Sequence, residues 1–189
     1  MAVSDEELCR QIAQRDRAAF ENLVERHQER TYRLAWSILK NPDDARDLSQ
    51  DAFVKLFQVA TSFDGRSRFS TWFYRIVVNL CLDHRRKGQG WRRLLSWSEP
   101  GDKSEPVDMT EFPSWEMGPE EEAGVRERAD RLWRAADRLP DKQRAALVLS
   151  IQEGLNSAEI GAVLNCSEAT VRVHLHRAMR ELKKTVGSV

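Results

Sequence analysis

The chain has 189 residues, with 30 Lys or Arg, 30 Asp or Glu and a formal net charge of zero at pH 7. The length allows one domain or two small ones, and the neutral total gives no overall basicity of the kind that indicates nucleic-acid binding. The charge is unevenly distributed, at +2 over residues 1–90, −4 over 91–139 and +2 over 140–189. Two slightly basic ends around an acidic middle indicate a modular chain.

Cysteine content and hydropathy indicate the compartment of the protein and whether it enters a membrane. Cys9, Cys81 and Cys166 are odd in number and far apart, so we expect small apolar residues in a reducing compartment and not a disulfide framework. The polar, acidic start predicts no signal peptide, and no apolar run approaches the roughly 18 residues of a membrane span. We therefore expect a cytoplasmic protein with no direct membrane insertion.

Residues 5–28 are predicted to form the first helix, with Ser4 as its N-cap and a small interruption near Asp16. Its apolar side is formed by Leu8, Ile12, Phe20, Leu23 and Val24. Residues 30–39 are apolar on most sides, which predicts a helix central to a bundle. The side chains concerned are Tyr32, Leu34, Ala35, Trp36, Ile38 and Leu39.

A third helix is predicted over residues 44–57, after a break at Asn41-Pro42 and with Asp43 as its cap. Its buried stripe would comprise Ala45, Leu48, Ala52, Phe53, Leu56 and Phe57. The opposite face is polar and carries Arg46, Asp47, Gln50, Asp51 and Lys55.

A Gly- and Ser-bearing loop over residues 61–69 precedes a fourth helix, predicted from Trp72 to about Lys87. Ser70 or Thr71 would cap this helix, and Gly88 and Gly90 would close it. Its buried stripe is formed by Phe73, Ile76, Val77 and Leu80, and a second face carries Arg75, Asn79 and Arg86. No segment alternates at period two, so we expect an all-α protein without a sheet.

Residues 99–122 hold nine acids, one lysine and four of the six prolines, which predicts a flexible acidic linker. Three tryptophans in and beside it (Trp91, Trp97 and Trp115) would either pack back on a domain or anchor the linker to a partner. A helix is predicted to resume near residue 119 or 120 and to run to Arg138. It would bury Val125, Ala129, Leu132, Trp133 and Ala136.

The last third of the chain predicts three more helices. Residues 141–153, closed by Gly154, would supply Ala145, Leu147, Val148 and Ile151 as scaffold. Residues 158–164 follow, with Asn156 or Ser157 as N-cap, and end at a polar break over residues 165–167. The small Gly161 would allow a second helix to approach closely.

The helix after Ser167 would bury Val171, Leu175, Ala178 and Leu182. From Arg172 onward it carries five Lys or Arg against one acid, Glu181. One interpretation is an αα-hairpin with a solvated face. The acid-poor face favours a helix-turn-helix, whose second helix lies in the DNA major groove.

Three segments together carry a resemblance to a known family. They are residues 43–53 (DDARDLSQDAF), residues 69–79 (FSTWFYRIVVN) and the helix-turn-helix. In this order and spacing they resemble the bacterial extracytoplasmic-function (ECF) sigma factors. The resemblance implies two small helical domains joined by the flexible acidic linker: a sigma-2 four-helix bundle (1–90), a linker (91–119) and a sigma-4 helix-turn-helix domain (120–189).

The resemblance also implies roles for particular residues. Core-polymerase binding, at the coiled coil of the β′ subunit, would fall to Arg46, Asp47, Gln50 and Asp51. The alternative for these residues is an ordinary solvated face. Contacts with the −10 element would come from Phe63, Arg66, Arg68, Phe69, Trp72, Tyr74, Arg75, Asn79 and Arg86. The alternative for Trp72 and Tyr74 is a place in the core. Contacts with the −35 element would come from Ser167, Thr170, Arg172, His176 and Arg177.

The resulting hypothesis is a promoter-specific initiation factor that binds core RNA polymerase (β′ coiled coil and β flap) and promoter DNA, and that an anti-sigma factor holds inactive. A response regulator with the same helix-turn-helix would need strands in residues 1–90. A helical enzyme or metal-binding module would need clustered nucleophiles, bases or ligands, and His174 and His176 lack the i, i+4 spacing of a helical metal site. We therefore expect no catalysis, cofactor, metal or small-molecule substrate.

Overall fold

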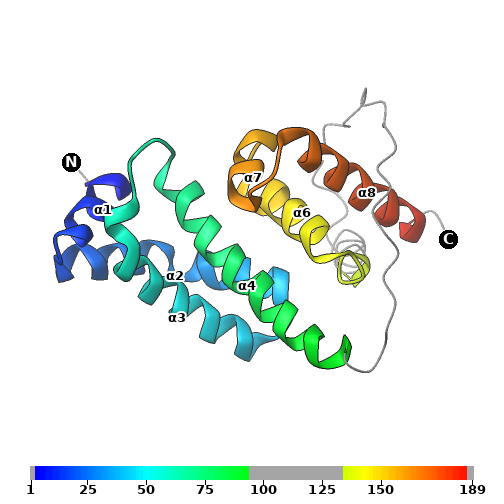
Figure 1. The fold of residues 1–189 in the computed structure, drawn as a ribbon, viewed down its shortest axis with the longest axis horizontal. Coiled ribbons are helices and arrows are strands. Elements are labelled where there is room, and N and C mark those ends of the chain that lie inside the picture. Colours follow the sequence, from blue (N-terminus) through cyan, green and yellow to red (C-terminus); the bar gives the residue numbers. More distant parts are fainter. Residues whose placement is uncertain (1–2, 94–133, 187–189) are drawn as a thin grey trace, which may run out of the picture.

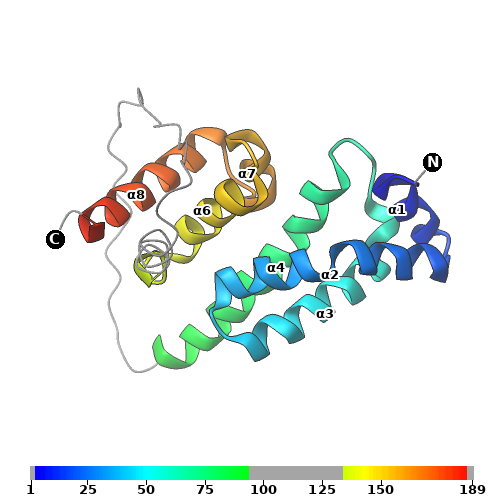
Figure 2. The ribbon, with the colours of Figure 1, turned by 180° about the vertical axis from the view of Figure 1, so that it is seen from behind.

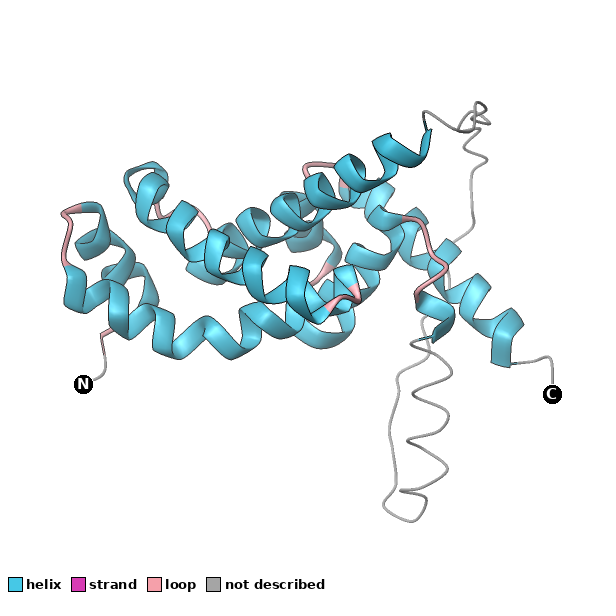
Figure 3. Cartoon of the chain, turned by 90° about the horizontal axis from the view of Figure 1, so that it is seen from below, coloured by secondary structure: helices cyan, strands magenta, loops and turns pink. Residues whose placement is uncertain are grey.

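The computed structural model describes residues 3–93 and 134–186, and this part of the chain is built from helices and loops (Figures 1 and 3). The first unit comprises α1 (Asp5–Ala13), α2 (Arg17–Leu39), α3 (Pro42–Val59), a short 3-10 helix η1 (Ala60–Ser62) and α4 (Phe69–Arg93). The second comprises α6 (Asp141–Glu153), α7 (Ser157–Leu164) and α8 (Glu168–Val186). The all-α prediction is confirmed, since the described ranges contain no strand.

The boundary between the first two helices differs from the prediction. The carboxylate of Asp16 accepts the backbone N–H of Ala19 at 3.1 Å, and Arg15 adopts a left-handed φ of 69°. Asp16 is therefore a true N-cap, which ends α1 early and starts α2. No capping residue or proline separates residues 28 and 30, so α2 continues through both predicted segments.

The cap of α3 also differs from the prediction. The side chain of Asn41, and not that of Asp43, accepts the N–H groups of Asp43 and Asp44 at 2.9 and 3.3 Å. Pro42 occupies the first turn, where its missing N–H costs nothing. In the predicted buried stripe of this helix, Leu48 and Phe57 are only half-buried.

Helix α4 begins and ends beyond its predicted limits. Its first backbone N–H, at Phe69, donates to the carboxylate of Glu6 on α1 at 3.1 Å, and this bond lowers the pKa of Glu6. The helix continues past Gly88 and Gly90 to Arg93. A glycine inside a helix costs about 1 kcal/mol relative to alanine, which does not by itself end a helix.

The second unit follows its predicted pattern closely. Helix α6 ends at Gly154 in the left-handed region, with φ 64°. Ile151, predicted as scaffold, is instead 59% exposed. Of the helix predicted before Leu139, the structure describes only its end, where Ala136 is buried. The other predicted contacts, at Val125, Ala129, Leu132 and Trp133, lie outside the described residues, as do the side chains of Trp91, Trp97 and Trp115.

The two units pack against each other, with α7 lying along α4 and α6 against α2 (Figures 1 and 2). One continuous apolar cluster contains buried residues of both, including Val77 and Val78 from α4 and Ile160 and Val163 from α7. Trp36, predicted among the core residues of α2, is 43% exposed. The ammonium group of Lys40 lies 4.1 Å from the centre of its ring.

Burial also sets the protonation state of two of the cysteines. Cys9 and Cys81 are free and buried, and burial raises their pKa to about 11 and about 12. Both are therefore protonated packing residues at neutral pH.

Within residues 3–93 and 134–186, none of the helices combines the length and hydropathy needed to cross a bilayer.

Candidate nucleic-acid interface

Helices α7 and α8 form a helix-turn-helix whose turn is held by local contacts. The side chain of Asn156 accepts the N–H groups of Ala158 and Glu159 at 3.0 Å, and Glu159 accepts the N–H of Asn156 in return. This capping box fixes the start of α7. A Cβ atom added at Gly161 would lie 2.8 Å from the carbonyl oxygen of Cys166. The predicted close approach at Gly161 is therefore made by the backbone of the turn.

The start of α8 presents polar groups to solvent. The hydroxyl of Ser167 accepts the backbone N–H of Thr170 at 3.1 Å, as expected of an N-cap. Ser167, Thr170 and Arg172 are exposed, and Arg172 forms an ion pair with Glu168 one turn earlier. The predicted stripe of Val171, Leu175, Ala178 and Leu182 is buried.

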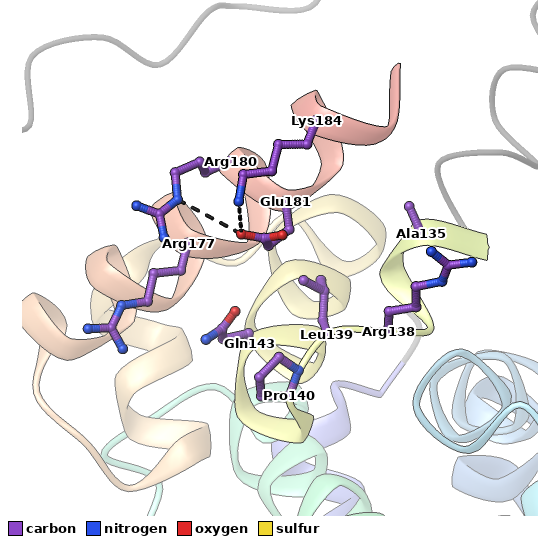
Figure 4. Close-up of a pocket in the computed structure, with 9 residues that line it drawn as sticks. All are labelled: Ala135, Arg138, Leu139, Pro140, Gln143, Arg177, Arg180, Glu181 and Lys184. Carbon is purple, nitrogen blue, oxygen red and sulfur yellow. Dashed lines mark hydrogen bonds and ion pairs between the residues drawn. The ribbon is translucent and has the colours of Figure 1, made fainter. Parts of the chain in front are cut away.

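His176 and Arg177, the remaining residues predicted to face the −35 element, are half-buried. Arg177 lines a cavity of about 380 Å³ between the start of α6 and the C-terminal half of α8 (Figure 4). Arg138, Arg180 and Lys184 also line it, and Glu181 pairs with Lys184 at 2.8 Å. Arg177 therefore belongs to the wall of this cavity, together with three other cations.

The loop before α4 and the first turn of α4 carry a cluster of aromatic side chains, some half-buried and one fully buried. Phe63 and Trp72 are half-buried, with ring centres 5.3 Å apart. Phe69 is fully buried beneath them, with ring centres 6.1 Å from each. Phe69 therefore forms the buried floor of the cluster, and its contact with DNA stays a prediction.

Tyr74 is likewise buried, with 1% of its surface exposed. Of the two interpretations considered for this residue, core aromatic is the one that its burial supports, and the DNA contact stays a prediction. Burial and the nearby Glu153 carboxylate raise the pKa of Tyr74. The sequence pattern could not show this, because Glu153 lies in the other unit.

The outer face of α4 and the preceding loop expose the other predicted −10 residues. Arg75 and Asn79 are exposed one turn apart, and Arg86 is exposed farther along and forms an ion pair with Asp83. Arg66 and Arg68 are exposed in the loop. The structure thus places a cationic track beside the half-buried Phe63 and Trp72.

Helix α3 exposes the polar face predicted for a protein partner. Arg46, Asp47, Gln50 and Asp51 are all exposed. Val54 lies among them on the helical surface and is 55% exposed, which the sequence analysis missed. Val54 follows Asp51 by three residues and Gln50 by four, and residues at this spacing share one face of a helix. The sequence could therefore have shown that an apolar side chain lies within this charged face.

Across residues 3–93 and 134–186, no group of three or more His, Cys, Asp or Glu side chains could hold a metal ion.

Comparison with known proteins decides the family. The models of sigma-70 region 2 and sigma-70 region 4 match residues 23–92 and 129–182. The ECF RNA polymerase sigma factor SigW of Bacillus subtilis is 31% identical over 176 residues, covering 93% of this chain and 92% of that protein. The chain belongs to the ECF RNA polymerase sigma factors. The ECF sigma-E factor of Escherichia coli K12 is 30% identical over 192 residues, covering 97% and 95% of the two chains.

Solved structures share the fold of this ECF sigma factor. CnrH in complex with the cytosolic domain of CnrY matches with a TM-score of 0.68 at 24% identity, covering 98% of this chain and 99% of that one. RpoE in complex with the anti-sigma factor NepR, from Bartonella quintana, matches with a TM-score of 0.63 at 20% identity, covering 89% and 97%. As a sigma factor, the chain acts with RNA polymerase in promoter-specific transcription initiation.

Proposed function

We propose that this sigma factor divides promoter recognition between a sigma-2 domain (1–90), which binds core polymerase and the −10 element, and a sigma-4 domain (120–189), which binds the −35 element. Residues 91–119 would link them. The proposal depends above all on the outer face of α4, where Arg75 and Asn79 are exposed one turn apart beside the half-buried Trp72.

Opening of the −10 element needs groups that hold single-stranded DNA. Unstacked bases bind on aromatic faces, and their backbone follows a cationic groove. Phe63 and Trp72 supply the aromatic faces, and Arg66 and Arg68 supply the charge. Asn79 can both donate and accept a hydrogen bond at a base edge. This surface would therefore trap the melted strand, while Arg86 would contact phosphates.

Recognition of the −35 element would fall to the start of α8. The free N–H groups and helix dipole beside Ser167 and Thr170 favour a phosphate, and the exposed Arg172 can reach a guanine in the major groove. The Arg172–Glu168 pair is exposed at both ends and is worth at most about 1 kcal/mol, so DNA can replace it.

The same surfaces would be available to an inhibitor. The solved structures of CnrH and RpoE were determined with the cytosolic domain of CnrY and with the anti-sigma factor NepR. We extend this to the present chain as an anti-sigma factor that covers its polymerase- and DNA-binding faces. In this role the chain performs no covalent chemistry of its own.

The test of the −10 assignment is Asn79→Ala in transcription with core polymerase. We expect initiation on a duplex promoter to fall by about tenfold to a hundredfold, the equivalent of one lost base contact. A template with a pre-melted −10 bubble should restore most of the activity. Gln28→Ala, which removes an exposed amide from α2, is the matched control and should leave initiation unchanged on both templates. An equal defect on duplex and bubble would reject a role in strand opening.

The test of polymerase docking is Asp47→Lys on the exposed face of α3. Reversing one charge at a complementary interface should weaken binding to core polymerase by about tenfold or more. The helical circular-dichroism signal should stay unchanged because Asp47 is exposed. Glu25→Lys makes the same charge change on α2 and serves as control. If both variants bind polymerase like the parent chain, α3 is not the docking surface.

A further inference from the structure

The cavity between the start of α6 and the C-terminal half of α8 is lined mainly by cations (Figure 4). Arg138 comes from the segment before α6, and three further cations come from α8. These are Arg177, Arg180 and Lys184, whose spacing of three and four residues places them on the same side of the helix. Among the described lining residues the single carboxylate belongs to Glu181, so their formal charge is +3.

The carboxylate of Glu181 is held by weak ion pairs. It pairs with Lys184 at 2.8 Å and lies 4.0 Å from the guanidinium of Arg180. The side chains of Arg180, Glu181 and Lys184 are 62%, 47% and 63% exposed, and ion pairs between groups so exposed contribute little. An added anion of higher charge can therefore displace this carboxylate from its partners.

The start of α6 adds positive potential beside these cations. Its N-cap is Pro140, whose ring has no acceptor for the first N–H groups of the helix. Pro140 and Gln143 both line the cavity. The carboxylate of Asp141, in the first turn, pairs with Arg85 of α4 at 2.8 Å. The positive end of the helix dipole therefore lies at the wall of the cavity, where it favours an anion.

The size and lining of the cavity favour a small ligand. Sites for small molecules have volumes of about 300–1,000 Å³, and this cavity falls within that range. Duplex DNA is read by protein elements that enter its grooves, and a duplex does not itself enter a cavity of this volume. Part of the lining is apolar and comes from Pro140 and from the buried residues Ala135 and Leu139. A small anion with an uncharged portion therefore fits both kinds of surface.

A chain of phosphate groups matches this lining better than an acidic peptide does. A guanidinium offers parallel donors that match a phosphate, and a di- or triphosphate concentrates its charges over a few bonds. A peptide carries at most one carboxylate side chain for each residue, or about 3.3 Å of extended chain.

We propose that the cavity binds a small molecule that carries a di- or triphosphate chain, either a nucleotide or inorganic polyphosphate. Its phosphates would lie against Arg138, Arg180 and Lys184, which line the cavity from two sides. The uncharged part of a nucleotide would lie against Ala135 and Leu139. This site is additional to the promoter recognition proposed above and does not depend on it.

The test is binding of inorganic tripolyphosphate to the full chain, measured by isothermal titration calorimetry at constant ionic strength. The parent chain should bind one tripolyphosphate. Arg180→Gln should weaken this binding by about tenfold or more, because it removes a charge-assisted hydrogen bond. Lys183→Gln is the matched control, since Lys183 is an exposed cation of the same helix that is not among the lining residues. The affinity of this control should stay within about twofold of the parent chain, because exposed charges are screened.

Two further variants exclude general damage and general attraction to α8. Arg138→Gln removes a cation from outside α8 and should also weaken binding by about tenfold. Glu181→Gln removes the competing carboxylate and should tighten binding by about threefold or more. All of these side chains are exposed, so the helical circular-dichroism signal should stay the same in each variant. Opposite changes in affinity cannot both arise from unfolding.

A comparison of ligands distinguishes the two sources of the phosphate chain. Tighter binding of ATP than of tripolyphosphate supports a nucleotide, and equal or weaker binding of ATP supports inorganic polyphosphate. Sulfate that binds as tightly as tripolyphosphate, or equal losses in Arg180→Gln and Lys183→Gln, would overturn the site in favour of general attraction. Loss of duplex-DNA binding in Arg180→Gln, with unchanged tripolyphosphate binding, would assign the cation to DNA phosphates and also overturn the site. The tripolyphosphate titrations involve neither polymerase nor promoter, so their failure would leave the proposed function standing.

Discussion

Replacing Arg144 with methionine is expected to lower the free energy of unfolding by about 3 kcal/mol. Arg144 is 2% exposed, and its guanidinium donates to the carbonyl oxygens of Ala136 and Ile38 at 3.0 and 3.1 Å and to that of Asp137. Burial lowers its pKa, and the hydrogen bonds that it makes within the described residues go to backbone carbonyls. The side chain therefore acts as a donor to backbone carbonyls of both units.

The expected loss has a definite physical origin. Methionine fills part of the volume but removes three hydrogen bonds from a charged donor, at about 1.5–3 kcal/mol each, and relief from burying a cation offsets part of this. The Ile38 and Ala136 carbonyl oxygens keep a second donor, in Arg85 and in the Leu139 N–H, which limits the loss to about 3 kcal/mol.

Urea denaturation followed by circular dichroism measures the change. Arg33→Met, which removes an exposed guanidinium, should remain within about 0.5 kcal/mol of the parent chain. A loss as small as this in Arg144→Met would show that water replaces the guanidinium.

Replacing Arg172 with alanine is expected to reduce discrimination at the −35 element by about 1–3 kcal/mol, or about tenfold to a hundredfold in relative affinity. The side chain is exposed near the start of α8, and among the described residues its ion pair is with Glu168 one turn away. A guanidinium can donate two parallel hydrogen bonds to guanine, which alanine cannot replace. Binding to promoters with matched and scrambled −35 sequences measures the effect.

Arg172→Lys distinguishes a base contact from a phosphate contact. Lysine retains the charge but lacks the planar pair of donors, so it should preserve general DNA affinity and lose base discrimination. Uniform weakening by alanine on all sequences, with full recovery by lysine, would show that Arg172 binds a phosphate.

Local chemistry accounts for the parts of the fold that were predicted well. The capping residues Ser4 and Asn156 and the left-handed Gly154 act within a few residues of their own position. The stripe from Val171 to Leu182 likewise repeats at helical spacing. The predicted interruption near Asp16 is present, as the N-cap of α2. The error at Asn41 arose beside Pro42 and Asp43, where neighbouring capping and breaking residues compete on similar terms.

Local spacing could not rank the aromatic residues by exposure. Phe69, Trp72 and Tyr74 lie within six residues of one another, yet Trp72 is half-exposed and the other two are buried. The contacts that bury Tyr74 come from Arg30 and Glu153, which are distant in the sequence. Two of the aromatic residues predicted to contact DNA are therefore buried in this arrangement.

The sequence by itself determined most of the helices and the helix-turn-helix, because capping, periodicity and charge placement act over a few residues. The family was indicated by the resemblance of three motifs and shown by the comparisons. Only the tertiary structure decided which side chains remain available and how the two units meet. The Arg30–Glu153 pair and the bond from Arg144 to Ile38 join residues more than a hundred positions apart. Such contacts depend on how buried surfaces and their polar partners fit together, which no local pattern records.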